Sequence, residues 1–201
     1  MDIKNKSQFI EYFLKGIKKP NQLKIGVEHE RFLFEGQNKK RISYITLKKL
    51  FENLKQNGWE PLFEKENIIG MKRDNQQITT EPGLQCELSG APLDNIHQVC
   101  AESSKFLKEI EAASIGLDIN TVSIGFDPFN NLSDIPKSPK QRYKIMTSEM
   151  PKGGSQSLEM MYRTCGIQIN YDYTSEINFE KIFRLGNYLT PLTIALYSNS
   201  P

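Results

Sequence analysis

Three segments of the chain, residues 24–34, 78–88 and 164–173, alternate polar and apolar side chains with the two-residue period of a β-strand. In the first segment Glu28 and Glu30 share one face, about 7 Å apart along the strand. The polar faces of the three segments together carry Glu28, Glu30, Glu81, Gln85, Glu87, Gln168, Asn170 and Asp172. Paired in one antiparallel sheet, these strands would present a concave polar face, backed by helices on the apolar side.

This polar face is rich in carboxylates and has few basic residues between them. Crowded carboxylates repel one another unless a cation joins them. Oxygen ligands without a histidine pair or a cysteine cluster suit a hard ion such as Mg²⁺ or Mn²⁺, and such magnesium sites usually also hold substrate phosphates. The pattern alone is as compatible with a divalent-metal site as with an ordinary solvent-exposed sheet face, and both interpretations stay open.

Helical spacing of apolar residues predicts helices at 7–18, 46–57, 92–114 and 178–198, which makes the chain an α+β protein. Ser7 is the expected cap of the first helix, and Pro191 is expected to kink or restart the last one. The residues expected to face inward are Phe9, Ile10, Phe13, Leu14, Ile17, Leu47, Leu50, Phe51, Leu54, Leu93, Ile96, Val99, Cys100, Phe106, Leu107 and Ile110. His97, beside the third stripe, is interpreted as a packing or surface residue.

The connection between the second and third strand segments offers further candidates. A strand is expected at 121–126, and residues 127–152, with four prolines, are predicted to form a long loop over the sheet. Lys152, Gly153 and Gly154 could present backbone N–H groups to an anion, with a plain turn as the alternative. Arg163 could clamp a substrate carboxylate, or pair with a nearby acid as an ordinary surface arginine.

Composition narrows the classes of function. A chain of 201 residues can bury a core without disulfides or metals, and no boundary divides it, so a single domain over 1–201 is expected. A net charge of +2 argues against nucleic-acid binding. No apolar stretch approaches a membrane span, and the first residues lack the apolar core of a secretion signal, so we expect a cytoplasmic protein. Cys86, Cys100 and Cys165 are interpreted as reduced, buried thiols.

Five motifs carry a family resemblance: IGVEHERF at 25–32, EPGLQCELSGAPL at 81–93, RYKIM at 142–146, MPKGG at 150–154 and MMYRTCGIQINYD at 160–172. In this order and spacing they resemble the plant and proteobacterial type of glutamate–cysteine ligase along nearly the whole chain. The resemblance implies the carboxylate–amine ligase fold shared with glutamine synthetase, a curved antiparallel sheet with helices on its outer face. Members of that family are longer, so the chain looks like the N-terminal portion of a ligase catalytic domain and is expected to be poorly active alone.

The resemblance also implies a reaction and its participants. The γ-carboxylate of L-glutamate attacks the γ-phosphate of ATP in the presence of Mg²⁺, with Mn²⁺ as the alternative ion. The amine of L-cysteine then displaces phosphate from the resulting acyl phosphate, in the first step of glutathione synthesis. The expected metal ligands are Glu28, Glu30, Glu81 and Glu87. The expected substrate-binding residues are Gln85, Gln168, Arg163 and Thr164, with Arg163 also the catalytic candidate, and Lys152, Gly153 and Gly154 are the candidates for ATP. Asn170 and Asp172 are expected to support the same face.

The chain departs from the family pattern at three positions. Leu84 and Cys86 stand where glycine and phenylalanine are expected, and Gly166 stands where threonine is expected. Leu84 and Cys86 lie on the apolar face by parity, as does Cys165, so they leave the acidic set intact and are interpreted as core residues. The alternatives to this ligase are a related ligase that joins glutamate to another amine and a non-catalytic module that binds a divalent ion. The sequence does not indicate an oligomeric state.

Overall fold

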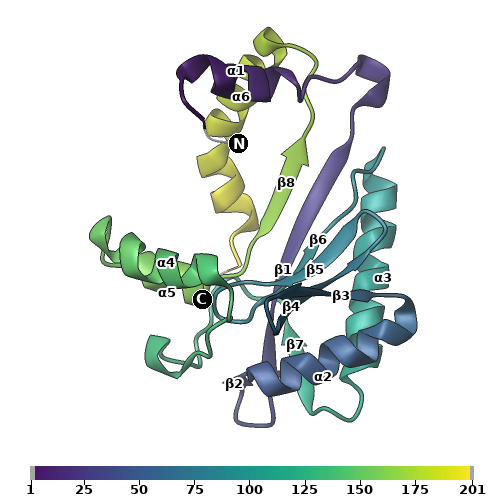
Figure 1. The fold of residues 1–201 in the computed structure, drawn as a ribbon, viewed down its shortest axis with the longest axis vertical. Helices are drawn as coiled ribbons and strands as arrows, with labels where there is room; N and C mark the ends of the chain where they lie inside the picture. The colour runs from purple at the N-terminus through teal and green to yellow at the C-terminus, as the bar shows by residue number, and fades with distance from the viewer. Residues whose placement is uncertain (1–2, 200–201) are drawn as a thin grey trace.

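The computed structural model describes residues 3–199, and a curved antiparallel sheet lies at their centre (Figure 1). Its strands are β1 (Ile25–Glu35), β2 (Lys40–Arg41), β3 (Glu60–Glu64), β4 (Asn67–Arg73), β5 (Gln76–Thr80), β6 (Cys86–Ser89), β7 (Ile119–Val122) and β8 (Ile167–Tyr171). Their order is β2-β1-β6-β5-β4-β3, and β7 and β8 also pair with β1. Every strand pair is antiparallel, so the predicted sheet is confirmed.

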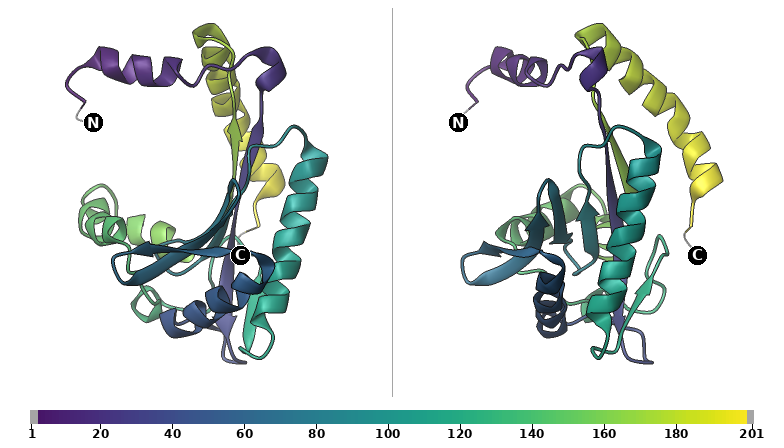
Figure 2. Two further views of the ribbon diagram at one scale, coloured as in Figure 1. Left: turned by 45° about the vertical axis from the view of Figure 1, so that its right-hand side comes forward. Right: turned by 90° about the vertical axis from the view of Figure 1, so that its right-hand side faces the viewer.

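The helices lie on both sides of this sheet. They are α1 (Lys6–Leu14), α2 (Tyr44–Leu54), α3 (Ile96–Ser114), α4 (Gln141–Glu149), α5 (Ser157–Arg163) and α6 (Glu176–Tyr197). Short 3₁₀ helices occur at Pro20–Gln22, Lys55–Asn57, Leu132–Asp134 and Met150–Lys152. Figure 2 shows α2 and α3 on the outer side of the curved strands and α4 and α5 on the other side. The α+β class is therefore confirmed. Helices α2 and α3 lie on the outer face as expected, whereas α4 and α5 were not predicted and lie on the other side.

The main core lies between the sheet and the helices α2 and α3. The predicted inward residues of α2 are all fully buried, and Ser43 caps this helix by accepting a hydrogen bond from the Thr46 backbone N–H. Helix α3 begins at Ile96, four residues later than predicted, because the backbone of Leu93 pairs with that of Ile25 in β1. Val99, Phe106 and Ile110 are buried as predicted. The expectations that Ile96 and Cys100 face inward are wrong, because both are exposed. His97 is exposed, in agreement with its interpretation as a surface residue.

The segment between β7 and α5 is not the predicted long loop. It contains helix α4, which forms because the prolines of this segment fall outside Gln141–Glu149 and leave those nine residues free to form backbone hydrogen bonds. The strand expected at 121–126 forms instead at Ile119–Val122, followed by an isolated bridge between Phe126 and Thr164. The connection therefore brings an ordered helix over the polar face of the sheet.

The segment 78–88, predicted as one strand, is two strands. β5 and β6 pair with each other, and residues 81–85 form the turn between them. The hairpin of β3 and β4 was not predicted. A register shift between Leu62 and Phe63 interrupts its alternation, which conceals the strand period in the sequence.

Helices α1 and α6 lie together at the end of the molecule farthest from α2 (Figure 1). α1 is capped by Asn5 rather than Ser7, ends at Leu14, and buries none of its residues, so its predicted packing against the core is wrong. Its contact is with α6, through the rings of Phe13 and Phe179 at 6.1 Å. α6 continues through Pro191 without the predicted restart. Within residues 3–199, no helix is long and apolar enough to cross a membrane.

Candidate functional site

Three of the four predicted metal ligands come together on the polar face of the sheet. Glu30 on β1 and Glu87 on β6 are directly opposite each other in the antiparallel register, and Glu81 begins the turn after β5. One carboxylate oxygen from each of the three lies within 4.8 Å of the others. We call Glu30, Glu81 and Glu87 the carboxylate triad. The fourth predicted ligand, Glu28, lies outside this group and accepts a hydrogen bond of 2.9 Å from the Asn170 amide.

Burial and mutual repulsion disfavour full ionisation of the triad. The pKa of Glu30 is raised to about 7, chiefly by burial and also by the charges of Glu81, Glu87 and Glu28, and the hydrogen bond donated by the Gly166 backbone N–H acts against this rise. The pKa of Glu81 is also raised, by burial and then by the charge of Glu87. A hard divalent cation would relieve both effects, since it supplies positive charge to oxygens that have lost water. The donor set therefore fits Mg²⁺ or Mn²⁺.

Each carboxylate of the triad is held in place by a second group. The hydroxyl of Tyr143 on α4 lies 2.9 Å from Glu81 and 3.1 Å from the carbonyl oxygen of Thr80. The Ser89 hydroxyl donates to Glu87 at 2.6 Å, and the Gly166 N–H donates to Glu30 at 2.7 Å. Partners of this kind orient metal ligands and fix their basicity. Tyr143 was missed as a site residue because the sequence did not predict α4, although it lies in the RYKIM motif.

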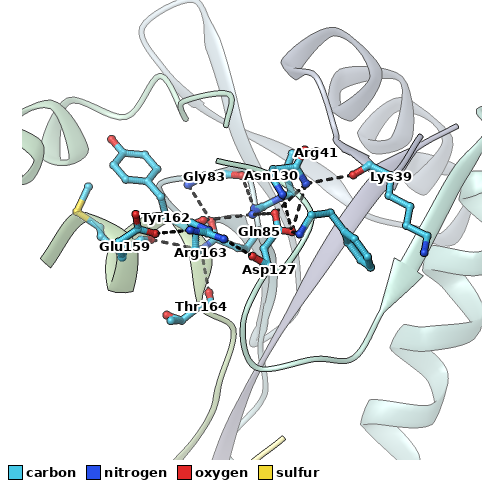
Figure 3. Close-up of polar contacts among 12 residues, drawn as sticks. Lys39, Arg41, Gly83, Gln85, Asp127, Asn130, Glu159, Tyr162, Arg163 and Thr164 are labelled. Carbon is cyan, nitrogen blue, oxygen red and sulfur yellow. Dashed lines mark hydrogen bonds and ion pairs between the residues drawn. The ribbon is translucent and has the colours of Figure 1, made fainter. Parts of the chain in front are cut away.

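Gln85 holds the turn that carries Glu81. Its side-chain oxygen accepts from the Gly83 N–H at 2.8 Å, and its amide nitrogen donates to the carbonyls of Thr164 at 2.9 Å and Met161 at 3.3 Å (Figure 3). The side chain is almost completely buried. Its hydrogen-bonding groups are thus engaged with the backbone, and its predicted contact with substrate stays a prediction.

The same turn requires two unusual backbone positions. Leu84 is in the left-handed region with φ of 60°, although it is fully buried. This explains why a glycine is expected there in the family pattern, since glycine adopts this region without steric cost. At Gly83, a Cβ atom would lie 2.7 Å from the Tyr162 carbonyl oxygen, so any side chain would push the turn away from α5.

A buried ion pair between Arg41 and Asp127 stabilises the turn of residues 81–85. The Arg41 guanidinium donates to the carbonyl oxygens of Gly83 at 2.5 Å and Tyr162 at 3.2 Å, and lies 3.4 Å from the Asp127 carboxylate (Figure 3). Both side chains of the pair are fully buried. Asp127 also accepts hydrogen bonds from the backbone and side chain of Asn130. Arg41 therefore joins three segments that are distant in sequence, and no sequence signal pointed to it.

Arg163 is also engaged with the protein. It forms an ion pair with Glu159 at 2.7 Å and donates to the Asp127 carbonyl oxygen at 2.8 Å (Figure 3). Its guanidinium also stacks on the ring of Phe126. This matches the alternative of an arginine paired with a nearby acid, although its side chain is largely buried. The Thr164 hydroxyl donates to the Met160 carbonyl oxygen at 2.5 Å. Substrate binding by these two residues stays a prediction.

The remaining residues that were predicted to belong to the site form no hydrogen bond or ion pair with Glu30, Glu81 or Glu87. Gln168 is exposed on β8, directly opposite Glu28. Lys152 pairs with Glu149 at 2.6 Å in a short 3₁₀ helix, and Gly153 and Gly154 continue into an exposed turn. Asp172 accepts a hydrogen bond from the Lys24 backbone N–H. The ATP contacts expected at 152–154 are thus still predictions.

The three cysteines are free thiols, as expected. Cys86 is buried, and burial raises its pKa to about 12. Burial and the nearby charge of Glu30 also raise the pKa of Cys165. Cys165 is half-buried and Cys100 is exposed, so the expectation of a buried thiol is confirmed for Cys86 and wrong for Cys100. The protonated state of Cys86 and Cys165 agrees with their interpretation as packing residues rather than nucleophiles.

Comparison with known proteins identifies the family. The model of glutamate–cysteine ligase family 2 matches residues 24–201. The chain is 42% identical over 197 residues to glutamate–cysteine ligase A, chloroplastic, of Oryza sativa subsp. japonica, and 42% identical to the chloroplastic glutamate–cysteine ligase of Medicago truncatula. It is 41% identical to that of Arabidopsis thaliana. These matches cover 98% of this chain but only 40%, 39% and 38% of the respective relatives. The chain belongs to glutamate–cysteine ligase family 2.

Proposed function

We propose that the chain is part of an ATP-dependent glutamate–cysteine ligase. In the reaction, the γ-carboxylate of L-glutamate takes the γ-phosphoryl group of ATP and releases ADP, and the amine of L-cysteine then displaces phosphate from the acyl phosphate. The observation that carries the proposal is the carboxylate triad, whose oxygens lie within 4.8 Å of one another in a chain of this family. A reaction between two anions needs such a concentration of metal ligands, because a bound cation neutralises the charge that keeps them apart.

The triad is the proposed magnesium site. When bound there, Mg²⁺ would stabilise the negative charge that develops on the transferred phosphoryl group. Tyr143, Ser89 and the Gly166 N–H would keep the three carboxylates in orientation through the hydrogen bonds described above. Glu28, held by Asn170, and Gln168 lie next along the same face and are the proposed contacts for a second ion or for glutamate.

The proposal extends to the fold and to the place of the chain in the enzyme. A curved antiparallel sheet with an acidic inner face and helices outside agrees with the carboxylate–amine ligase fold shared with glutamine synthetase. The chain spans about two fifths of the length of its curated relatives, so we propose that it contributes the acidic side of a larger active site. A cytoplasmic location is likewise a proposal, which imaging of a fluorescent fusion would test.

The experiment is a measurement of ADP release by the complete gene product that carries these 201 residues. It is supplied with Mg²⁺, ATP and glutamate, and with cysteine or other amines in turn. The proposal predicts release that rises sharply with cysteine. Release with another amine but not with cysteine would make the protein a related ligase. A folded protein that releases no ADP under any of these conditions would contradict the ligase and support a module that only binds a divalent ion.

A further inference from the structure

Lys140 is a nearly buried lysine that forms no ion pair within the described part of the chain. The residue is only 9% exposed and occupies the position just before the first residue of α4, where its side chain makes no capping hydrogen bond. Among the described residues, no side chain or carbonyl accepts a hydrogen bond from its ammonium group, and no carboxylate oxygen lies within 4.0 Å of it. Its nitrogen lies 5.3 Å from the centre of the Tyr143 ring. The ammonium nitrogen is not one of the fully buried polar atoms without a partner, so it reaches solvent, and its donors are open to an anion that binds there.

The backbone around Lys140 is fixed to the turn of the triad. The Ser138 N–H donates to the Pro82 carbonyl oxygen at 2.8 Å, and the Ser138 and Thr80 hydroxyls are 3.0 Å apart. Tyr143, whose ring lies beside the ammonium, contacts Glu81 through its hydroxyl. Lys140 is therefore held beside the triad by contacts on both sides of it in sequence.

The electrostatics agree with this placement. Burial lowers the pKa of Lys140, and the charges of Glu81 and Glu87 act most strongly in the opposite direction. Arg142 and Glu64 are the other charged groups near it, and they act in opposite senses. The ammonium group thus interacts electrostatically with Glu81 and Glu87 but forms no ion pair with them. Its three donors are available to another anion.

We propose that Lys140 is a substrate-binding residue that donates a hydrogen bond to an oxygen of the phosphoryl group transferred from ATP. This inference rests on the proposed function and adds a residue to the same site. With a divalent ion on the triad, the carboxylates are neutralised by the metal, and the phosphoryl oxygens become the anionic partner of the ammonium. A lysine suits this task because it presents a compact charge with three rotatable donors.

The competing explanation is that Lys140 only balances the charge of the triad. The two explanations predict different effects of removing the ammonium on ATP binding. A counter-ion competes with the metal, so its loss would raise metal affinity and leave ATP binding unchanged. A phosphoryl ligand acts on ATP, so its loss would weaken ATP binding whatever happens to the metal.

The test compares Lys140→Met and Lys140→Arg with the matched control Lys144→Gln in the complete gene product. Lys144 is an exposed lysine on the same helix, outside the proposed site. Binding of Mn²⁺ alone is measured by electron paramagnetic resonance, binding of ATP with Mg²⁺ by calorimetry, and ADP release by steady-state kinetics. The methionine variant keeps the apolar stem of the side chain, and the arginine variant keeps the charge if the first does not fold.

We expect Lys140→Met to weaken ATP binding and to lower kcat by about tenfold or more, the usual range for a lost hydrogen bond to a charged group. The KM for glutamate should stay within about twofold, and Mn²⁺ should bind at least as tightly as to the unchanged protein. Lys140→Arg should recover part of the ATP affinity. ATP binding equal to that of Lys144→Gln would overturn the inference while the ligase stands. If the unchanged protein binds ATP but releases no ADP, the proposed function fails instead, and the ATP-binding comparison still decides the role of Lys140.

Discussion

Glu30 and Glu87 face each other directly across the antiparallel strands β1 and β6, and Glu81 approaches them from the turn after β5. Like charges opposite each other in a sheet are destabilising. Helix α4 lies over this pair and holds Glu81 through Tyr143, so the protein maintains the repulsion instead of avoiding it. A site that concentrates negative charge in this way is suited to bind a cation.

Replacing Glu87 with glutamine should weaken Mn²⁺ binding by at least about tenfold, because one charged oxygen ligand is lost. The melting temperature of the metal-free protein should stay the same or rise, since the substitution also removes repulsion from Glu30. Electron paramagnetic resonance measures the first quantity and thermal denaturation the second. Glu111→Gln, at an exposed position of α3, is the control. Unchanged Mn²⁺ affinity in Glu87→Gln would remove this residue from the site.

Metal affinity should increase with pH and level off above about 7, because the ion must displace the proton of Glu30. The stability of the metal-free protein should change with pH in the opposite direction. The pKa of Glu30 is raised from 4.5 to about 7 on folding, so the folded state keeps a proton that the unfolded state loses, and stability falls as pH rises through this interval. Calorimetric titration and denaturation at several pH values measure the two effects. Both should be flatter in Glu30→Gln, and an identical pH profile in that variant would contradict the assignment.

Removing Arg41 should lower the free energy of unfolding by about 3–5 kcal/mol, because Asp127 would be left buried without its partner. Arg41→Met is the variant to compare by urea denaturation with Lys40→Met, which changes an exposed neighbour. The turn of residues 81–85 should also become mobile, since Gly83 loses a hydrogen bond. A loss equal to that of Lys40→Met would show that the network does not hold the turn.

At position 84, glycine should be better tolerated than alanine. Both substitutions remove the buried leucine side chain, but glycine also relieves the left-handed backbone conformation at φ of 60°. We expect Leu84→Gly to be more stable than Leu84→Ala by about 1 kcal/mol, although both are less stable than the unchanged protein. Urea denaturation of the two variants measures the difference. The reverse order would indicate that the turn does not constrain this residue.

The sequence predicted the sheet and the shared face of its acids because strand alternation is a local property. Parity predicted that Glu30 and Glu87 lie on the same face but not that they pair, because pairing depends on the register of β1 and β6. The helix α2 follows from its clear apolar stripe. The roles of Arg41, Gln85 and Tyr143 depend on contacts between segments distant in sequence, which no local pattern reports. Helix α4 was not predicted because nearby prolines favoured a loop. The position of this helix over the triad was therefore not predicted either. The prediction that α1 packs against the core was wrong because an apolar stripe does not specify what covers it. Neither α1 nor α6 has a buried residue.

The most direct test of the central claim is a crystal structure of the protein with bound Mn²⁺, located by its anomalous scattering. Mn²⁺ binds carboxylate oxygens as Mg²⁺ does and can be identified without ambiguity by this signal. The account predicts an ion coordinated by oxygens of Glu30, Glu81 and Glu87, and loss of the signal in Glu81→Gln. An ion bound only elsewhere, or no bound ion in crystals soaked at a high Mn²⁺ concentration, would contradict the claim that the carboxylate triad is a metal site.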